Sequence, residues 1–259
     1  MYDWPEVREV TDAFWARAAA NLRDAGVDAP GSLTRGADLR KIWTAPDLLV
    51  AQTCGLPLVR GECGDALPFA LPSYDVPGCA PGTYSSAIIA RDEARLTLDD
   101  FEGSVLAING WDSQSGCNAL KSTLADRVSE NGPFFKRIVV SGAHRRSADL
   151  VASGGADLCA LDAVAWALYK SSEPARSARL RVLEWTIESP SLPFIMPPDL
   201  GDRSDELYRA LRDAARSVPA CPAIPSDIAP AELSDYDLVR KMDEEVAGVT
   251  FAPQDDAHG

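Results

Sequence analysis

The sequence predicts an α/β fold, and three observations support that prediction. Short β-prone runs bounded by Gly, Pro or Asp recur along the chain, and segments with helical spacing of apolar residues lie between several of them. This alternation of strands and helices is typical of α/β proteins. Hydrophobic residues make up 46% and charged residues 25% of the 259 residues, as in a folded protein with one large or two smaller domains.

The first part of the chain is expected to contain two helices and a strand. An amphipathic helix is predicted between Pro5, which suits an early helical position, and Gly26, which supplies a stop. Its apolar residues recur at helical spacing: Val7, Val10, Phe14, Ala18 and Leu22. A short helix over 37–43 and a buried strand over 47–51 follow, and the strand ends in a polar turn over 52–55.

The rest of the chain continues this alternation. Further strands are expected at 66–71, 84–90, 104–108, 138–140, 157–161 and 181–186. Helices are expected at 115–128, 147–153, 163–170, 205–218 and 235–246. Two Pro-rich segments, 190–198 and 219–230, are expected to be irregular, and the polar tail that includes His258 to be disordered.

The charge balance and the N-terminus exclude several classes of protein. Lys and Arg total 25 against 39 Asp and Glu, a formal charge of −14 that repels polyanions, so nucleic acid is not expected as a partner. No apolar run approaches the ~20 residues of a membrane-spanning helix. The first residues lack the basic and apolar regions of a signal peptide, which leaves a cytoplasmic protein or a removed leader as alternatives.

The six cysteines are scattered without any CxxC spacing, which disfavours zinc-ribbon and thioredoxin-like sites. Cys63 and Cys79 lie in Gly/Pro-rich segments, and a disulfide between them is one alternative in an oxidising compartment. Free thiols are the favoured alternative, because a chain of this size needs no covalent cross-links.

The most informative segment is 107–120, where an expected strand leads through a Gly/Ser-rich turn directly into a helix. The first N–H groups of a helix have no internal partner and carry partial positive charge, so they bind anions without a nearby Lys or Arg. Ser113 and Ser115 add hydroxyl donors, and Gly116 lets the backbone approach closely. The turn therefore predicts an oxyanion site, with an ordinary serine N-cap as the alternative.

Other motifs are missing from this turn. The chain has no G-x-x-x-x-G-K-[ST] and no G-x-G-x-x-G after a strand, which disfavours nucleotide binding. Neither Ser113 nor Ser115 stands in a G-x-S-x-G elbow, so the sequence does not support a serine nucleophile.

Two further polar residues follow expected strands. His144 comes after the strand at 138–140, and Asp162 comes at the end of the strand at 157–161. Ligands of parallel α/β sheets collect at the carboxyl ends of strands, so His144, Asp162 and the Ser113 turn are expected to face one crevice. Taken singly, His144 and Asp162 would by default be capping or surface residues.

Four strings in this order resemble the PhnD-like family, the substrate-binding proteins of phosphate, phosphite and phosphonate ABC transporters. They are Pro81-Gly-Thr-Tyr-Ser85, Ser113-Gln-Ser-Gly116, Ser141-Gly-Ala-His144 and Gly155-Ala-Asp-Leu-Cys-Ala-Leu-Asp162. The resemblance extends from about 47 to 198. It implies a two-lobed type II periplasmic-binding-protein fold, with two α/β lobes joined by crossover strands at 84–90 and 181–195.

The same resemblance implies a domain division and a hinge motion. Lobe one would be discontinuous, with residues 1–86 and 187–259, and lobe two would consist of residues 87–186. Closure of the lobes around a ligand would then create a shape that a partner recognises.

The resemblance also implies roles for particular residues. Ser113, Gln114, Ser115 and Gly116 match the family's oxyanion turn, with Gln114 at its variable position. His144 matches a histidine that donates to an oxyanion oxygen. Weaker matches are the hinge residues Thr83 and Tyr84 and the first-lobe residues Gln52 and Thr53.

The chain departs from the family at two places. Relatives that bind aminoalkyl phosphonates have an acidic residue before a proline on the return segment, where this chain has Leu192-Pro193. A cationic aminophosphonate is therefore disfavoured, although Asp162 would supply one carboxylate. The family fold also opens with a β-strand, and this chain begins where that strand should be ending.

The sequence thus predicts a solute-binding protein for a small tetrahedral oxyanion (phosphonate, phosphite or phosphate), without catalysis, cofactor or metal. An ABC permease would be its partner, and its location would be periplasmic by resemblance, with a cytoplasmic sensor as a variant. One rival is a hydrolase or transferase with Cys117 as nucleophile, His144 as base and Asp162 as orienting residue. Another is an interaction module with Trp111, Trp166 and Trp185 at its interface. Most of these residues are better explained as core or cleft walls.

Overall fold

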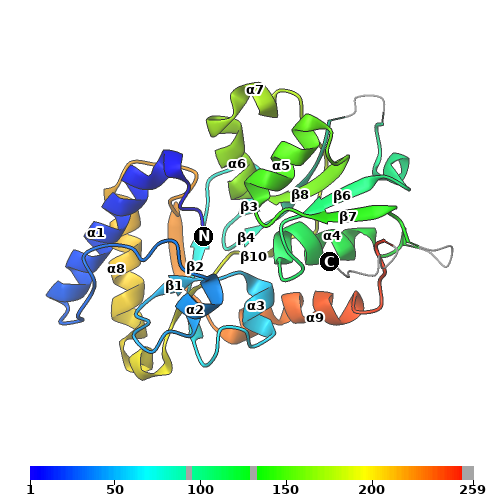
Figure 1. The fold of residues 1–259 in the computed structure, drawn as a ribbon. Coiled ribbons are helices and arrows are strands. Elements are labelled where there is room, and N and C mark those ends of the chain that lie inside the picture. The colour runs from blue at the N-terminus through cyan, green and yellow to red at the C-terminus, as the bar shows by residue number, and fades with distance from the viewer. Residues whose placement is uncertain (92–94, 129–132, 253–259) are drawn as a thin grey trace. The chain divides into compact units, whose positions relative to one another are not determined.

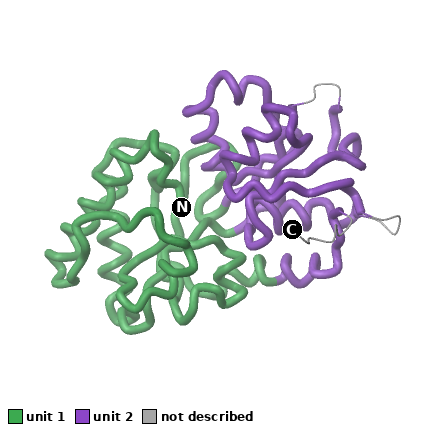
Figure 2. The backbone as a smooth tube through the Cα atoms, viewed as in Figure 1, with its two compact units in different colours: residues 1–83, 190–240 green, residues 84–189, 241–259 purple. Residues whose placement is uncertain are grey.

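The computed structural model describes residues 1–91, 95–128 and 133–252 (Figure 1). The tail around His258, expected to be disordered, lies outside the described residues. The chain forms two compact units, coloured separately in Figure 2. Unit 1 consists of Met1–Thr83 and Pro190–Arg240, and unit 2 of Tyr84–Ser189 and Lys241–Gly259.

Unit 1 is built on a four-stranded sheet with the strand order β1-β11-β2-β12. The strands are β1 (Ala51–Gln52), β2 (Leu67–Ser73), β11 (Phe194–Met196) and β12 (Asp227–Pro230). Every neighbouring pair of these strands is antiparallel. The strands come from two distant parts of the chain, so both parts are needed to form one sheet.

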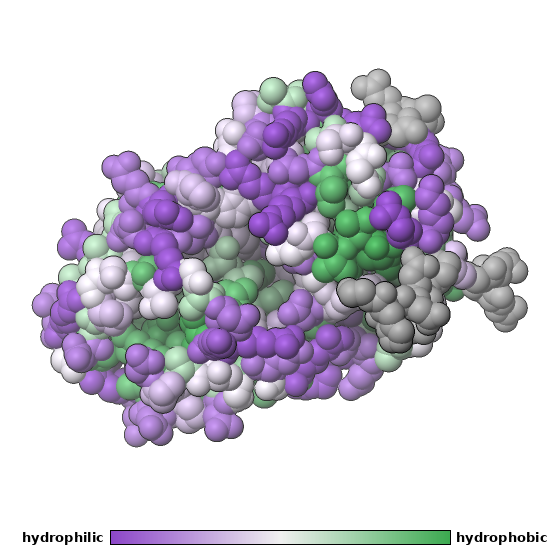
Figure 3. Space-filling model, viewed as in Figure 1, coloured by the Kyte–Doolittle hydropathy of each residue, from purple (hydrophilic) through white to green (hydrophobic). Residues whose placement is uncertain are grey.

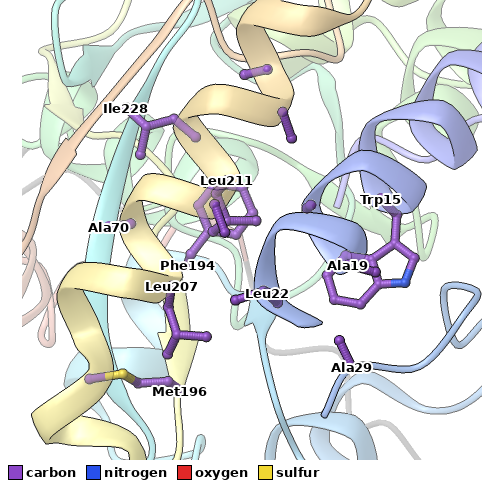
Figure 4. Close-up of a cluster of buried hydrophobic side chains, with 14 of the residues drawn as sticks. Trp15, Ala19, Leu22, Ala29, Ala70, Phe194, Met196, Leu207, Leu211 and Ile228 are labelled. Carbon is purple, nitrogen blue, oxygen red and sulfur yellow. The ribbon is translucent and has the colours of Figure 1, made fainter. Parts of the chain in front are cut away.

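Two long helices and this sheet enclose the main core of unit 1 (Figure 4). The helices α1 (Arg8–Asp24) and α8 (Ser204–Ser217) pack on each other. Leu22 of α1 points toward Leu207 of α8, whereas the Trp15 ring lies on the other side of α1, near Ala29. The apolar spacing that predicted the first helix is thus explained by a single buried face.

Short elements complete unit 1. They are η1 (Pro5–Val7), α2 (Leu39–Trp43), α3 (Gly55–Val59), η4 (Pro198–Arg203), η5 (Leu233–Tyr236) and the start of α9 (Asp237–Glu245). A second apolar cluster joins α2, α3, η5 and α9 to the sheet, with Trp43, Leu56, Ile195, Tyr236 and Val239 buried in it. The third passage of the chain between the units falls inside α9, between Arg240 and Lys241.

Unit 2 contains a five-stranded sheet with the order β7-β6-β8-β5-β9. The strands are β5 (Ser86–Ala90), β6 (Val105–Ile108), β7 (Arg137–Val140), β8 (Leu158–Asp162) and β9 (Arg181–Trp185). Strand β6 runs parallel to β7 and β8, whereas β5 runs antiparallel to β8 and β9. The carboxyl ends of β6, β7, β8 and β9 therefore share one edge, and the segments that follow β6, β7 and β8 leave the sheet there.

The helices of unit 2 connect these strands. They are η2 (Leu98–Phe101), the π-helix η3 (Gln114–Asn118), α4 (Ala119–Leu124), α5 (His144–Ser153), α6 (Ala163–Ser172) and α7 (Pro174–Ser177). The core between sheet and helices is apolar, with Ile88, Phe101, Leu106, Leu120 and Phe135 almost fully buried. A third, small sheet belongs to neither unit alone and has the order β10-β4-β3. Strand β3 (Cys79–Ala80) is in unit 1, whereas β4 (Thr83–Tyr84) and β10 (Ser189–Pro190) each include a boundary between the units.

Several sequence predictions are corrected by these elements. The strand expected over 47–51 is reduced to β1, and the polar turn after it runs into α3, which begins at Gly55. The Pro-rich segments expected to be irregular contain β11 and β12. Strand β12 lies at the edge of its sheet. Proline has no N–H, and on the solvent side of an edge strand no hydrogen bond to another strand is lost.

The predicted domain division also differs from the two units. The chain leaves unit 1 after Thr83 and returns at Pro190, not at 86 and 187. Residues 241–259, expected in lobe one, are grouped with unit 2. Phe251 is the physical reason: its ring lies 5.7 Å from that of Phe135, and its carbonyl accepts a 2.8 Å hydrogen bond from the Phe135 N–H.

The surface agrees with the acidic, polar composition. Hydrophilic side chains cover much of the face shown in Figure 3, and hydrophobic ones gather in smaller areas. Within the described part of the chain, no helix has the length and apolar composition needed to cross a membrane.

Candidate anion-binding site in unit 2

A single turn joins β6 to the helix that follows it. Ser113 is the N-cap of this helix, and its Oγ accepts a 3.0 Å hydrogen bond from the N–H of Gly116. The Asn118 N–H donates to the Ser113 carbonyl at 3.0 Å, a five-residue spacing that makes the first turn a π-helix. The single α-helix expected over 115–128 is therefore η3 followed by α4. Ser113 is therefore a helix N-cap, as the alternative interpretation of the sequence predicted. Its hydroxyl also lies close to the hydroxyl of Ser115.

Three of the expected site residues meet in a chain of contacts. The Ser115 Oγ lies 2.9 Å from Nε2 of His144, and 3.4 Å from the Ser113 Oγ. Both serines are buried, whereas His144 is partly exposed. They come together because β6 and β7 are parallel neighbours, so the segments after Ile108 and Val140 start side by side.

Burial determines the charge of His144. It lowers the pKa of the ring to about 4, and the nearby Ala160 carbonyl, which favours the protonated ring, offsets only part of that effect. The buried Nδ1 makes no hydrogen bond of normal geometry with any described residue. At neutral pH the ring is therefore uncharged, with one N–H donor and one lone pair.

We expect this pKa to leave a measurable pH dependence. An unfolded histidine binds its proton near pH 6.5, and the folded one only near pH 4, so between these values the unfolded chain holds more protons. The free energy of unfolding should then fall as the pH drops from 7 toward 4, by at most about 1.4 kcal/mol per pH unit from this group. Urea unfolding from pH 4.5 to 7.5 measures it, and the slope should flatten in His144→Gln. An NMR titration midpoint near 6.5 for the His144 ring would contradict this prediction.

The starts of two helices add backbone donors. Ala143, the N-cap of α5, provides no side-chain cap, and the fourth N–H of that helix, at Ser147, binds the Ala143 carbonyl. The first N–H groups of α5, beginning at His144, are the ones that a helix leaves without internal partners. At the start of η3, the Ser113 hydroxyl binds the Gly116 N–H. Uncharged donors and two helix dipoles thus converge near His144.

Asp162 lies at the predicted edge and acts as a helix cap. It is buried, and its Oδ1 accepts hydrogen bonds from the N–H groups of Val164 (2.8 Å) and Ala165 (3.1 Å) at the start of α6. The third helix start at this edge therefore already has its own carboxylate. The Oδ1 of Asp162 is thus a helix cap, as the alternative interpretation of the sequence predicted.

The Gln114 side chain is held inside unit 2. Its Nε2 donates to the Ser189 Oγ at 3.0 Å and to the Met242 Sδ at 3.1 Å, and its Oε1 accepts from the Asn118 Nδ2 at 2.8 Å. The side chain is completely buried. Gln114 is also predicted to contact ligand, and within unit 2 these bonds give its amide a role in fixing the turn.

The side chains of Asn109 and His144 leave no room for a Cβ at position 116, so this residue has to be glycine. A Cβ built on this glycine would lie 1.9 Å from the Asn109 Oδ1 and 3.2 Å from the His144 Cε1. Sequence reasoning gave no role to Asn109. The signal was present, however, because Asn109 directly follows β6 and so stands at the edge where the other site residues gather.

The remaining expected residues divide between the two units. Gln52, Thr53 and Thr83 belong to unit 1, whereas Tyr84 begins unit 2 and is buried. The Gln52 Nε2 donates to the Tyr74 Oη and the Leu192 carbonyl, both at 3.0 Å. The Thr53 hydroxyl lies 3.3 Å from both the Cys54 carbonyl and the Cys63 Sγ. These donors of Gln52 and Thr53 serve the structure of unit 1 itself.

The cysteine alternatives do not match this geometry. Cys117 is buried in the apolar core of unit 2, while His144 is bonded to Ser115 and Asp162 caps α6. Cys63 and Cys79 are not joined by a disulfide. Among the described residues, no group of three or more His, Cys, Asp or Glu could hold a metal ion.

The tryptophans of the interaction-module alternative differ in exposure. Trp166 is a buried core residue, whereas Trp111 is 51% exposed. The Lys121 ammonium lies over the Trp111 ring, 5.5 Å from its centroid. An exposed ring with this intramolecular partner gives no support for an interface.

Comparisons with known proteins agree with this fold. A family model described as "ABC transporter, phosphonate, periplasmic substrate-binding protein" matches residues 20–225. No curated protein matches the chain.

Solved structures resemble the chain over most of its length. A binding protein component of an ABC phosphonate transporter from Pseudomonas aeruginosa is 15% identical with a TM-score of 0.72, covering 93% of this chain and 82% of that one. PhnD1 from Prochlorococcus marinus, solved with methylphosphonate, is 16% identical with a TM-score of 0.71, covering 93% of each chain. A Xanthomonas citri protein bound to chloride is 16% identical with a TM-score of 0.68, covering 95% of each chain. At these identities the likeness establishes a common fold.

Proposed function

The chain belongs to the family of periplasmic substrate-binding proteins of ABC phosphonate transporters, and from this premise we propose that the turn after β6 binds the oxyanion group of the ligand. The fold is that of type II periplasmic binding proteins. The ligand class is a small tetrahedral phosphorus oxyanion: a phosphonate, phosphite or phosphate. Ser113, Ser115 and His144 are its side-chain contacts.

The single observation that carries this proposal is the contact chain from Ser113 through Ser115 to His144 at the starts of two helices. Hydroxyl groups, a neutral imidazole and backbone N–H groups are all able to donate to oxygen. A hydrogen bond to a charged acceptor is roughly twice as strong as a neutral one, and a site with little water strengthens it further. Neutral donors are therefore sufficient for an anion, even in a protein with a formal charge of −14.

The biological role follows from the family. Its members are substrate-binding components of transporters rather than enzymes, which supports a binding role for the Ser115–His144 pair in place of catalysis. We propose an ABC permease as the partner and the periplasm as the site of action. The Oδ1 of Asp162 binds backbone N–H groups, and Leu192 stands where relatives have an acidic residue, so 2-aminoethylphosphonate should bind less tightly than methylphosphonate.

Ser115→Ala should weaken binding of methylphosphonate, phosphite or phosphate by about 1.5–3 kcal/mol, about 10- to 150-fold, because it removes a donor to a charged group. His144→Ala should have a similar effect. A thermal-shift panel identifies the ligand, since a ligand that binds only the native state raises Tm. Isothermal titration calorimetry then gives the affinities of the variants.

Sulfate and Ser153→Ala serve as controls. Ser153 lies at the opposite end of α5, where its hydroxyl bonds to carbonyls of its own helix, so its loss should leave affinity unchanged. A shift with a phosphorus oxyanion and none with sulfate would support a selective binder. If Ser115→Ala and His144→Ala both bound as tightly as wild type, the assignment of the turn would be wrong.

A further inference from the structure

Asn109 is the first residue after β6, and its amide is unsatisfied in the structure. The Oδ1 is buried without a hydrogen-bond partner, and the side chain forms no hydrogen bond with any described residue. An asparagine amide can accept two hydrogen bonds and donate two. Native proteins rarely bury a polar atom in this way without a functional reason.

The position of the amide is defined by two residues of the anion turn. A Cβ on Gly116 would lie 1.9 Å from the Asn109 Oδ1 and 3.2 Å from the His144 Cε1, so the amide oxygen, the Gly116 backbone and the imidazole meet at one point. With Oδ1 placed against Gly116, the Nδ2 is the part of the amide that remains accessible, because Asn109 is only partly buried and its Nδ2 is not among the buried atoms.

A purely structural role accounts for only half of this arrangement. The Oδ1 packed against the Gly116 Cα forms at most a weak Cα–H···O contact, which would help to fix the turn. That contact gives no partner to the two N–H donors of Nδ2. An accessible, unpaired donor close to the Gly116 backbone and the His144 imidazole is what a bound oxyanion would use.

We infer that Asn109 is a further ligand-binding residue, whose Nδ2 donates a hydrogen bond to an oxygen of the phosphorus oxyanion beside His144. This inference rests on the proposed function, because it assigns a contact within the same site. It also predicts a rule of specificity. The Nδ2 donates to an oxygen that accepts there, as an anionic oxygen does, and disfavours a group that can only donate.

Three substitutions separate the alternatives, with titrations of methylphosphonate, phosphite and phosphate in parallel at pH 7.5. Asn109→Ala should weaken binding of the bound ligands about 10- to 100-fold, because one donor to the anion is lost. Asn109→Asp keeps the shape but replaces the donor with a charged oxygen, so the loss should exceed 100-fold. Ser153→Asp adds the same charge at the far end of α5 and should change affinity less than threefold.

The outcomes distinguish this inference from the proposed function. If Ser115→Ala weakens binding while Asn109→Ala and Asn109→Asp bind like wild type, the inference is wrong and the oxyanion turn stands. If Asn109→Ala weakens binding but Asn109→Asp binds like wild type at pH 7.5, where its carboxylate can only accept, the ligand donates to this residue and the assignment of Nδ2 as donor is overturned. If Asn109→Asp fails to fold, Asn109→Ala decides alone. If Ser115→Ala has no effect on binding, the proposed function fails first.

Discussion

Gly116→Ala should reduce ligand affinity at least 100-fold and lower the free energy of unfolding by about 1–3 kcal/mol. The added methyl group would lie 1.9 Å from the Asn109 Oδ1 and 3.2 Å from the His144 Cε1, so both neighbours must move. Gly116 also supplies the N–H that binds the Ser113 Oγ. Displacing the glycine would therefore disturb the cap, Asn109 and His144 together, which is why the effect on binding should exceed that of losing any one donor.

Titration calorimetry and urea unfolding measure the two parts of this result. Gly248→Ala is the matched control in unit 2, since no described atom lies within 4 Å of a Cβ at that position. Its affinity should equal that of wild type, and its stability should change by less than about 0.5 kcal/mol. Wild-type binding by Gly116→Ala would show that the packing around this glycine does not determine the site.

Gln114→Ala should lower the free energy of unfolding by about 2–4 kcal/mol, the second large effect. The amide is fully buried and satisfies Ser189, Met242 and Asn118 at once. Truncation leaves the Asn118 Nδ2 without this acceptor and opens a cavity, and both changes are destabilising. Chemical unfolding at pH 7 in the absence of ligand measures the effect.

Ser189→Ala is the comparison for this prediction, because it removes only one of the three partners. It should cost about 1 kcal/mol. A loss below 0.5 kcal/mol in Gln114→Ala would mean that the buried amide does not hold the turn. Equal losses in the two variants would mean that the bond to Ser189 accounts for the whole effect.

The predictions from sequence were most accurate where side-chain periodicity and local composition decide the structure. The helix that carries Ala18 and Leu22 buries the face that their spacing marks, and the uninterrupted β-prone run before Arg91 contains the fully buried strand β5. The Gly and Ser residues at 113–116 marked the turn after β6, which we propose as the anion site. His144 was found because a residue that follows a parallel strand must lie at the edge of the sheet.

Other features depend on contacts that no local pattern encodes. The buried amide of Gln114 is anchored by Ser189 and Met242, which are 75 and 128 residues away along the chain. The strand Phe194–Met196 forms because it pairs with two strands from the first third of the sequence. Likewise, Phe251 joins unit 2 through a ring contact with Phe135. In each case tertiary contacts decided between local alternatives.

The five-residue spacing at the start of η3 limits how this protein can change its length. A π-turn holds one more residue than an α-helical turn, and each helical residue rotates the chain by roughly 100°. Deleting one residue between Ser113 and Asn118 would restore the ordinary ladder but turn Ser115 away from His144. Inserting one residue there would rotate Ser115 by a similar angle in the opposite direction, again away from His144. Substitutions in this loop can thus alter which anion is preferred, whereas a single-codon insertion or deletion would remove the recognition of anions altogether.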